Sequence, residues 1–179
     1  VVSVDTSSAE LIREVAGVGA GLLNDVRALQ APGALRAAAD SGLPVCLMHM
    51  QGKPVTMQDE PSYQGVVAEV GEFLLRRVSA CNEVGIDSHQ IILDPGFGFG
   101  KTLEHNLALM KGLERLTRME RPLAVGASRK SFIGDLTGAE VNDRLPGSLA
   151  SACRAAQAGV AIIRTHDVKE TSQTLKVWS

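Results

Sequence analysis

The pattern of apolar and polar positions changes period repeatedly along the chain. Short continuous apolar runs predict six buried strands, at Val1–Val4, Gly21–Asn24, Pro44–Met48, Gln90–Leu93, Pro122–Gly126 and Gly159–Arg164. Apolar residues three and four apart predict helices between them, over Leu11–Ala16, Pro32–Ser41, Val66–Val78, Leu103–Leu116 and Leu145–Ala158. Strands that are apolar throughout and alternate with helices predict an α/β fold, in which helices cover a parallel sheet.

Three local signals accompany this pattern. Ser7 and Glu10 stand three residues apart before the first predicted helix, which is the spacing of a capping box. A polar stretch from Gln51 to Pro61 predicts a loop. The small residues of Leu145–Ala158 predict a helix that packs tightly against a neighbouring element.

A polar side chain stands at the carboxyl end of each predicted strand: Asp5, Asn24, His49, Asp94, Ser128 and Arg164. In a barrel all such ends converge on one mouth, whereas in an open doubly wound sheet only those near the switch point meet. The pattern therefore favours a (β/α)8 TIM barrel. A full barrel has eight units and about 250 residues. We accordingly expect residues 1–179 to be a single domain that lacks its first two βα units and is incomplete at its N-terminus.

The most distinctive stretch is DPGFGFGK, from Asp94 to Lys101, which follows an apolar strand. Its proline ends the strand, and its three alternating glycines allow torsions and close approaches that side chains block. A carboxylate is costly in such a place unless a ligand binds it. Phe97 and Phe99, between the glycines, are candidates to stack on a flat ligand.

The same run does not have the spacing of a nucleotide-binding P-loop, although glycines precede Lys101 and Thr102. A P-loop needs a glycine, four residues and then Gly-Lys-Ser/Thr, and Pro95 stands where the first glycine belongs. The Gly-x-Gly-x-x-Gly fingerprint is also broken, because the sixth position counted from Gly96 is Lys101. Nucleotide binding by this loop is therefore disfavoured.

Composition narrows the class of partner. The chain has 45% hydrophobic and 21% charged residues, as is typical of a globular domain, and its net charge is −2. This balance predicts small-molecule substrates, with no nucleic acid or membrane as partner. Cys46, Cys81 and Cys153 are far apart and form no C-x-x-C pair, so we expect neither a disulfide framework nor a zinc site, and a cytoplasmic location.

The polar residues of the predicted mouth suit a heterocycle that carries a phosphate. Asp94 can accept two parallel N–H bonds from an amidine-like edge, such as that of guanine or pterin. Asn24 and Lys130 can serve the remaining ring nitrogens and a carbonyl. Arg164 presents a planar fork that matches phosphate oxygens, and His166 can add a donor. The full set is Asp5, Asn24, Asp94, Lys130, Arg164 and His166.

Each of these residues also has a purely structural explanation. Asp5 can cap the first helix, Asn24 can belong to a turn, and the Ser128–Lys130 run can be a solvated basic cap. His49, between two methionines, is more often a packed strand-end residue than a metal ligand. The Arg164–Asp167 run can cap a helix. The functional interpretation is favoured because these explanations would have to hold independently at every strand end.

Six blocks, in order and at consistent spacing, resemble the signatures of the dihydropteroate synthase family. They are SVDTS at Ser3–Ser7, NDVRAL at Asn24–Leu29, LMHMQGKPVTMQ at Leu47–Gln58, LDPGFGFGKTLEHN at Leu93–Asn106, GASRKSFIG at Gly126–Gly134 and IRTHDVKET at Ile163–Thr171. The resemblance implies a (β/α)8 barrel that joins 6-hydroxymethyl-7,8-dihydropterin diphosphate to 4-aminobenzoate. Such an enzyme releases diphosphate and forms 7,8-dihydropteroate for folate synthesis.

The resemblance also implies roles for individual residues. Those for the pterin are Asp5, Asn24, Met50, Asp94, Phe99, Gly126 and Lys130. Those for the diphosphate are Arg164 and His166. Those for 4-aminobenzoate, at the site that sulfonamides imitate, are Phe99, Ser128 and Lys130. Lys130, Arg164 and Asp94 would take part in catalysis, and Mg²⁺ would accompany the diphosphate.

Two N-terminal loops that the resemblance implies are not in this sequence: one near the metal, with an asparagine, and one rich in glycine that closes over the site. We therefore expect no metal ligand within this chain, an incomplete site, and doubtful activity of this polypeptide by itself. Loss of two strands would also expose parallel sheet edges.

Two alternatives stay open. A methyltransferase that passes a methyl group from methyltetrahydrofolate to a corrinoid protein uses a similar pterin-binding barrel. It binds neither aminobenzoate nor diphosphate, so the Ser128–Lys130 and Arg164–His166 runs argue against it. The other alternative is a non-catalytic, pterin-binding fragment. We also expect a homodimer, with Leu145–Ala158 as its face.

Overall fold

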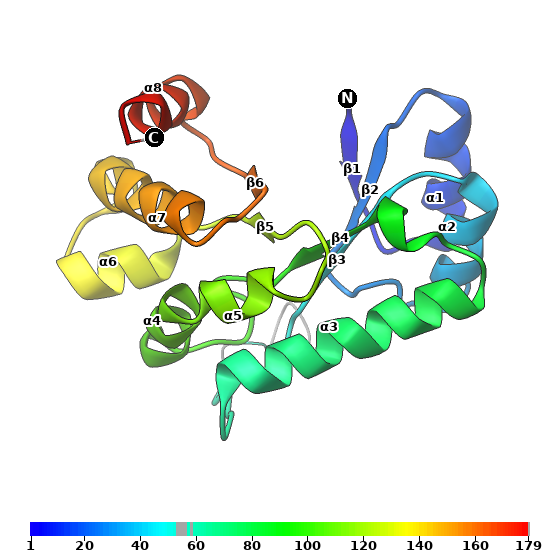
Figure 1. Ribbon diagram of the computed structural model, residues 1–179, viewed down its shortest axis with the longest axis horizontal. Coiled ribbons are helices and arrows are strands. Elements are labelled where there is room, and N and C mark those ends of the chain that lie inside the picture. The colour runs from blue at the N-terminus through cyan, green and yellow to red at the C-terminus, as the bar shows by residue number, and fades with distance from the viewer. Residues whose placement is uncertain (53–56, 58, 179) are drawn as a thin grey trace.

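Strands and helices alternate along the whole chain in the computed structural model, which describes residues 1–52, 57 and 59–178 (Figure 1). The strands are β1 (Ser3–Asp5), β2 (Leu22–Asp25), β3 (Val45–Met48), β4 (Ile91–Asp94), β5 (Ala124–Val125) and β6 (Ile162–Ile163). The α-helices are α1 (Ala9–Gly17), α2 (Ala34–Ser41), α3 (Val66–Glu83), α4 (Leu103–Lys111), α5 (Leu113–Thr117), α6 (Ser131–Thr137), α7 (Leu145–Gln157) and α8 (Val168–Trp178). Two short 3-10 helices are η1 (Ser88–Gln90) and η2 (Val141–Asp143).

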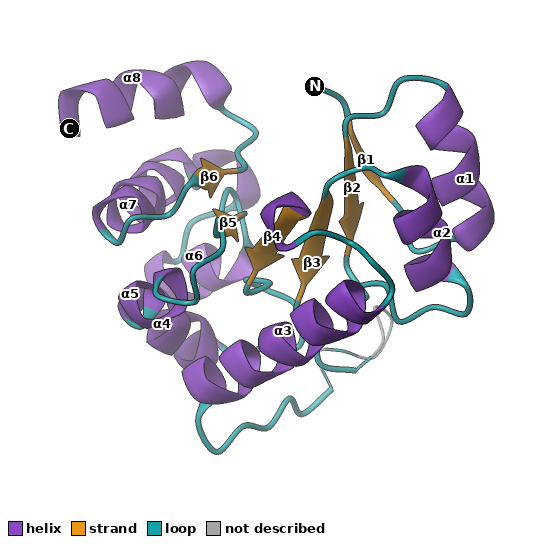
Figure 2. Ribbon diagram, turned by 45° about the vertical axis from the view of Figure 1, so that its right-hand side comes forward, coloured by secondary structure: helices purple, strands orange, loops and turns teal. Residues whose placement is uncertain are grey.

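All strand pairings are parallel, and strands that neighbour one another in the chain are neighbours in space. β1 to β4 form one sheet in chain order, and β5 pairs with β6. A parallel bridge between Leu93 and Leu123 joins the two groups. The strands thus form one arc with β1 and β6 at its ends, and Figure 2 shows α1, α2 and α3 along the outer side of β1 to β4. The predicted α/β class with parallel strands is confirmed.

The core lies between the strands and the helices that cover them. All four residues of β3 are buried, and Leu74 and Val70 of α3 are fully buried in the same cluster. A strand that is buried along its whole length is expected where helices cover one face and the barrel interior the other. Burial of each such aliphatic side chain stabilises the fold by roughly 1.5–3 kcal/mol.

β5 and β6 are much shorter than predicted. β5 comprises only Ala124–Val125 of the predicted Pro122–Gly126, and β6 comprises only Ile162–Ile163 of the predicted Gly159–Arg164. β1 begins at Ser3, two residues later than predicted, and Val1 and Val2 are exposed. Among the described residues, β1 and β6 each have a hydrogen-bonded neighbour on one side only.

The predicted capping box at Ser7 and Glu10 is wrong. The N-cap of α1 is Ser8, whose side chain accepts from the backbone N–H of Leu11 at 3.3 Å. Ser7 instead donates its hydroxyl to the carboxylate of Asp25, at the end of β2. A tertiary contact has therefore taken the side chain that the local pattern assigned to the helix.

The single helix predicted over Leu103–Leu116 is two helices, α4 and α5, which are interrupted at Gly112. A Cβ at Gly112 would lie 2.7 Å from Cγ2 of Val67 in α3. The absence of a side chain lets α3 pass close to this point, and the same glycine ends the first helix.

The small-residue helix packs as predicted. A Cβ at Gly147 in α7 would overlap the side chain of Ile133 in α6, and Ala152 and Ala155 are buried.

Residues 53–56 and 58 of the predicted Gln51–Pro61 loop lie outside the described residues. Within the described part of the chain, the helices are all too short or too polar to cross a membrane.

Candidate active site

A cavity of about 440 Å³ opens on the inner side of the arc, and it is lined by residues of every strand or of the segment that follows it. Four predicted site residues lie on it, and they are Asp5, Asn24, Asp94 and Arg164. The carboxyl ends of parallel strands share one rim, which is why residues far apart in the sequence meet here. Asp94 and Arg164 therefore face one cavity rather than separate surfaces.

Asp94 is the buried acid of this cavity. It is the last residue of β4, it is 4% exposed, and its Oδ1 accepts from the backbone N–H of Gly96 at 2.7 Å. Burial raises the pKa of Asp94, while the Gly96 bond and the charges of Arg164, Lys101 and Lys130 act in the opposite direction. A ligand with two parallel N–H donors would favour the ionised carboxylate further.

The glycines of the loop after β4 make room chiefly for the protein's own backbone. Gly96 and Gly100 have φ values of 70° and 60°, and a Cβ at either would overlap the carbonyl of His49 or of Gln51. The sequence interpretation, in which these glycines admit a ligand, is therefore incomplete, because the loop packs directly on the segment that follows β3.

Lys101 holds this loop from inside, a role that the sequence pattern does not indicate. Its side chain is buried, and Nζ lies 3.0 Å from each of three acceptors: the carbonyls of Gly96 and Phe99, and Nδ1 of His49. Burial lowers the pKa of Lys101 to about 7, and the nearby Asp94 raises it in part. Asn106, in α4, also accepts from the Gly98 N–H at 2.8 Å.

His49 is a packed strand-end residue. It is 6% exposed and stacks edge-on against Phe73 of α3, with 4.9 Å between ring centroids. Burial, and then the charge of Lys101, lower the pKa of His49 to about 3, so the imidazole is neutral. It can therefore accept a hydrogen bond from Lys101.

At the far side of the cavity, the ends of β1, β2 and β6 are joined by polar contacts. Asn24 donates from Nδ2 to Oδ2 of Asp5 at 2.9 Å, and the same oxygen lies 3.8 Å from Nη1 of Arg164. The guanidinium of Arg164 also lies over Gly126, where a Cβ would be 3.0 Å from its Nε. Both charged side chains are about half exposed, at 54%, so a ligand can reach them.

Lys130 and Phe99 lie together beside the glycine loop. Nζ of Lys130 is 4.1 Å from the centroid of the Phe99 ring, a cation–π contact. A Cβ at Gly98 would be 3.2 Å from Cδ of Lys130, so the absence of a side chain at Gly98 makes room for the lysine side chain. Burial and the charge of Arg164 lower the pKa of Lys130, and Asp94 raises it.

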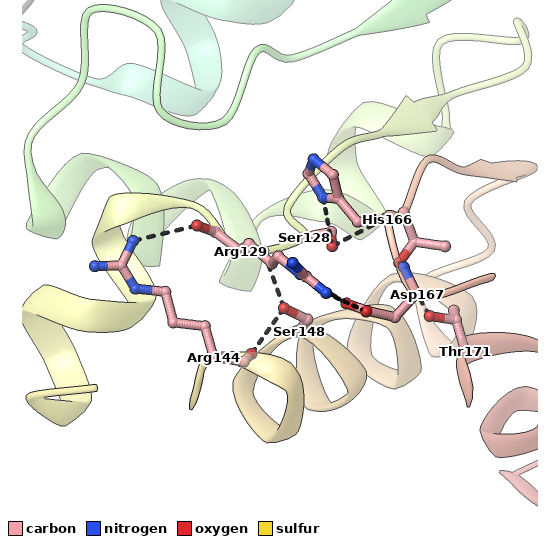
Figure 3. A network of polar contacts seen from close by, with 8 residues as sticks. Ser128, Arg129, Arg144, Ser148, His166, Asp167 and Thr171 are labelled. Carbon is pink, nitrogen blue, oxygen red and sulfur yellow. Dashed lines mark hydrogen bonds and ion pairs between the residues drawn. The ribbon is translucent and has the colours of Figure 1, made fainter. Parts of the chain in front are cut away.

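Ser128 and His166 contact one another (Figure 3). The Ser128 hydroxyl accepts from the His166 backbone N–H at 3.2 Å and lies 3.0 Å from the His166 Nδ1. The residues next to them, Arg129 and Asp167, form an ion pair. The loops that follow β5 and β6 are thus tied to one another beside the cavity.

Two aromatic or apolar candidates lie elsewhere. Phe97 is 1% exposed and packs in the core, 6.0 Å from the ring of Phe132, so its predicted stacking on a ligand is wrong. Met50 lines a separate cavity of about 410 Å³ with Arg27 and Phe73. Its role in pterin binding stays a prediction.

Other hollows carry less chemistry. One of about 530 Å³ lies between the end of α7, β6 and α8 and is lined mostly by apolar side chains with the exposed Lys176. The described residues contain no group of three His, Cys, Asp or Glu side chains placed to hold a metal ion. The convergence of opposite charges makes the 440 Å³ cavity the candidate site.

Comparison with known proteins agrees with this geometry. A family model for pterin binding enzymes matches residues 1–166. The chain belongs to the pterin-binding enzyme family. Within it, the chain is 53% identical over 176 residues to the dihydropteroate synthase of Escherichia coli (strain K12), and the match covers 98% of this chain and 62% of that protein. It is 48% identical over 177 residues to the dihydropteroate synthase of Haemophilus influenzae, of which 64% is covered.

Solved structures of this family superpose closely on the chain. The Yersinia pestis dihydropteroate synthase in a sulfonamide drug complex has a TM-score of 0.96 and 49% identity, and 98% of this chain and 64% of that chain are covered. The Xanthomonas albilineans enzyme with 4-aminobenzoic acid has a TM-score of 0.92 and 47% identity, over 98% of this chain and 63% of that one. The chain therefore spans just under two thirds of the length of these pterin-binding enzymes.

Proposed function

We propose that the polypeptide carrying this chain is a dihydropteroate synthase. It would condense 6-hydroxymethyl-7,8-dihydropterin diphosphate with 4-aminobenzoate, release diphosphate and form 7,8-dihydropteroate. The observation that carries the proposal is the cavity where a buried acid, Asp94, and a half-exposed cation, Arg164, line the same walls. The identity of 53% to the Escherichia coli enzyme supports it.

The acid side of the cavity suits the pterin ring. Asp94 can accept two parallel N–H bonds from the amino-pyrimidine edge, which is charge-assisted bidentate recognition. Asn24, with Asp5 on its amide nitrogen, presents its amide oxygen to a ring donor. Phe99 does not line this cavity; it lies beside the glycine loop with Lys130 over its ring, and it would supply a flat face for the pterin.

The basic side suits the diphosphate. Arg164 lies across Gly126 with half of its side chain exposed, and its fork matches phosphate oxygens. His166 is exposed two residues on. The bond between the methylene carbon and the diphosphate oxygen breaks, so negative charge grows on the leaving group, and donors already in place stabilise it.

The second substrate attacks the methylene carbon that the diphosphate leaves. A neutral arylamine forms the new carbon–nitrogen bond and then loses a proton, so it needs little help from a base. Ser128, Lys130 and Phe99 would hold it, and positioning would supply most of the rate enhancement. The related Xanthomonas albilineans structure with 4-aminobenzoic acid supports a site of this kind.

Magnesium is expected to accompany the diphosphate. Within the described residues, no three His, Cys, Asp or Glu side chains lie close enough together to bind it. The cysteines at 46, 81 and 153 are free and buried, which supports a reducing compartment such as the cytoplasm.

A turnover assay tests the proposal. Both substrates are supplied to the polypeptide, and 7,8-dihydropteroate is measured by liquid chromatography, with Arg164→Ala and a matched surface control, Arg36→Ala. We expect product from the wild type and the control, and kcat/KM lower by about 100-fold in Arg164→Ala, as for a lost charge-assisted contact. Pterin binding without product would favour a non-catalytic fragment. Methyl transfer from methyltetrahydrofolate would favour the corrinoid-dependent class.

A further inference from the structure

The loops that follow β5 and β6 are joined at two consecutive points (Figure 3). Ser128 bonds to His166 through its hydroxyl. The next residue, Arg129, donates from Nε to Oδ2 of Asp167 at 3.0 Å and from Nη2 to Oδ1. Two ties between adjacent residue pairs fix the position of one loop along the other, which a single tie would not do.

The backbone of Arg129 is held in an uncommon conformation. Its φ of 57° lies in the left-handed region, which side-chain-bearing residues seldom adopt. Its N–H donates to the Ser148 hydroxyl at 2.9 Å, and its carbonyl accepts from Nη1 of Arg144 at 3.2 Å. The turn directs the neighbouring Ser128 to the loop after β6 and Lys130 to the glycine loop.

The charge of Arg129 is paired with the carboxylate of Asp167. Hydrogen bonding to Asp167 raises the pKa of Arg129, and the same contact lowers the pKa of Asp167. Asp167 directly precedes α8, where a carboxylate commonly caps helix N–H groups, yet both of its oxygens bond to Arg129. Neither residue lines the 440 Å³ cavity.

We propose that Arg129 and Asp167 are positioning residues of the reaction proposed above. Their ion pair fixes the distance between the side chains that would hold 4-aminobenzoate and those that would hold the diphosphate. This inference rests on the proposed function. It also makes a statement about the two loops that does not depend on turnover: breaking the pair should loosen the Ser128–His166 contact.

Steady-state kinetics test the catalytic part, with Arg129→Gln, Asp167→Asn and the double variant. Each single variant is expected to raise KM for 4-aminobenzoate at least fivefold and to change kcat less. The double variant should be no worse than the poorer single one, because the two residues act as one unit. Arg129→Lys, which keeps the charge but not the fork, should show a smaller rise. A control, Arg154→Gln, removes an ion pair between α7 and Glu114 of α5 and should leave KM unchanged.

Amide hydrogen exchange tests the structural part in the same proteins. In Asp167→Asn we expect faster exchange at the N–H groups of Arg129 and His166, with α7 unchanged. Unchanged KM in an active protein, or a loss of kcat and melting temperature without a change in KM, overturns the proposal. An inactive wild type would refute the proposed function. The positioning role of the ion pair would then be decided by hydrogen exchange alone. Faster exchange in Asp167→Asn would support that role, and unchanged exchange would overturn it.

Discussion

At the carboxyl end of β4, Asp94 is a carboxylate removed from water and surrounded by compensating groups. The Gly96 N–H bonds to it, and Arg164, Lys101 and Lys130 oppose the rise in its pKa that burial causes. A buried carboxylate with cations around it and an open cavity before it is arranged for a ligand that donates hydrogen bonds.

Gly126 lets the Arg164 side chain lie flat against the strand end. In Gly126→Ala the new Cβ would be 3.0 Å from Nε of the arginine, so the flexible guanidinium should move aside at little cost in stability. We expect a nearly unchanged melting temperature and KM for the pterin diphosphate higher by about 10-fold, equivalent to ~1.4 kcal/mol. Gly65→Ala, where a Cβ meets open space, is the control. A parallel loss in both variants would refute the explanation.

Lys101 should make stability depend on pH. Burial lowers its pKa from 10.5 to about 7 in the folded state. Between these values the unfolded chain binds more protons, so the free energy of unfolding contributed by this residue should rise with pH, and below about 7 it should be flat. Denaturant unfolding of the wild type and Lys101→Met over this range measures the difference. A difference that stays constant would mean that three acceptors keep the ammonium charged.

Residues whose direction follows from strand geometry could be predicted from the sequence, and those placed by loops could not. Asp94 and Asn24 lie at the carboxyl ends of strands, and the strand geometry sets the direction of their side chains. Phe97 and Phe99 look equivalent in the sequence, yet the loop turns one into the core and leaves the other half-buried. The left-handed turn at Arg129 has no signal in its residue type.

Among the elements, the alternation of strands and helices was predictable because each apolar run is long enough to show its period. One boundary failed because a tertiary contact decided it: Ser7 bonds to Asp25 instead of capping α1. β5 and β6 are also shorter than the apolar runs that predict them. The break between α4 and α5 depends on how closely α3 passes Gly112, which no local pattern shows.

Gly112→Ala tests that contact between elements. The added Cβ would be 2.7 Å from Cγ2 of Val67, a stiff side chain, so we expect a loss of about 1–3 kcal/mol in the free energy of unfolding. Gly17→Ala, at the end of α1 with nothing near its Cβ, should be neutral or slightly stabilising. Equal stability of the wild type and Gly112→Ala in urea would show that α3 can move away.

At the scale of the whole molecule, one cluster of buried residues extends from Ile12 of α1 to Ala158 after α7. We therefore propose that residues 1–179 act as one domain.

The homodimer stays a prediction. Gly147 packs against Ile133 inside the chain, and the outer face of α7 stays the predicted dimer face. Exposed apolar side chains also lie on α8, where Val177 and Trp178 are 85% and 56% exposed. Light scattering of the wild type and a Val177→Glu variant would decide.

The central claim is that the strand ends form one cavity in which Asp94 anchors a pterin. Calorimetric titration of 6-hydroxymethyl-7,8-dihydropterin into the wild type, Asp94→Asn and the surface control Asp40→Asn tests it most directly. We predict binding to the wild type and control, and affinity lower by about 100-fold or more in Asp94→Asn, because a bidentate charged acceptor is lost. Equal affinity in all three proteins, or a wild type that binds no pterin, would contradict the claim.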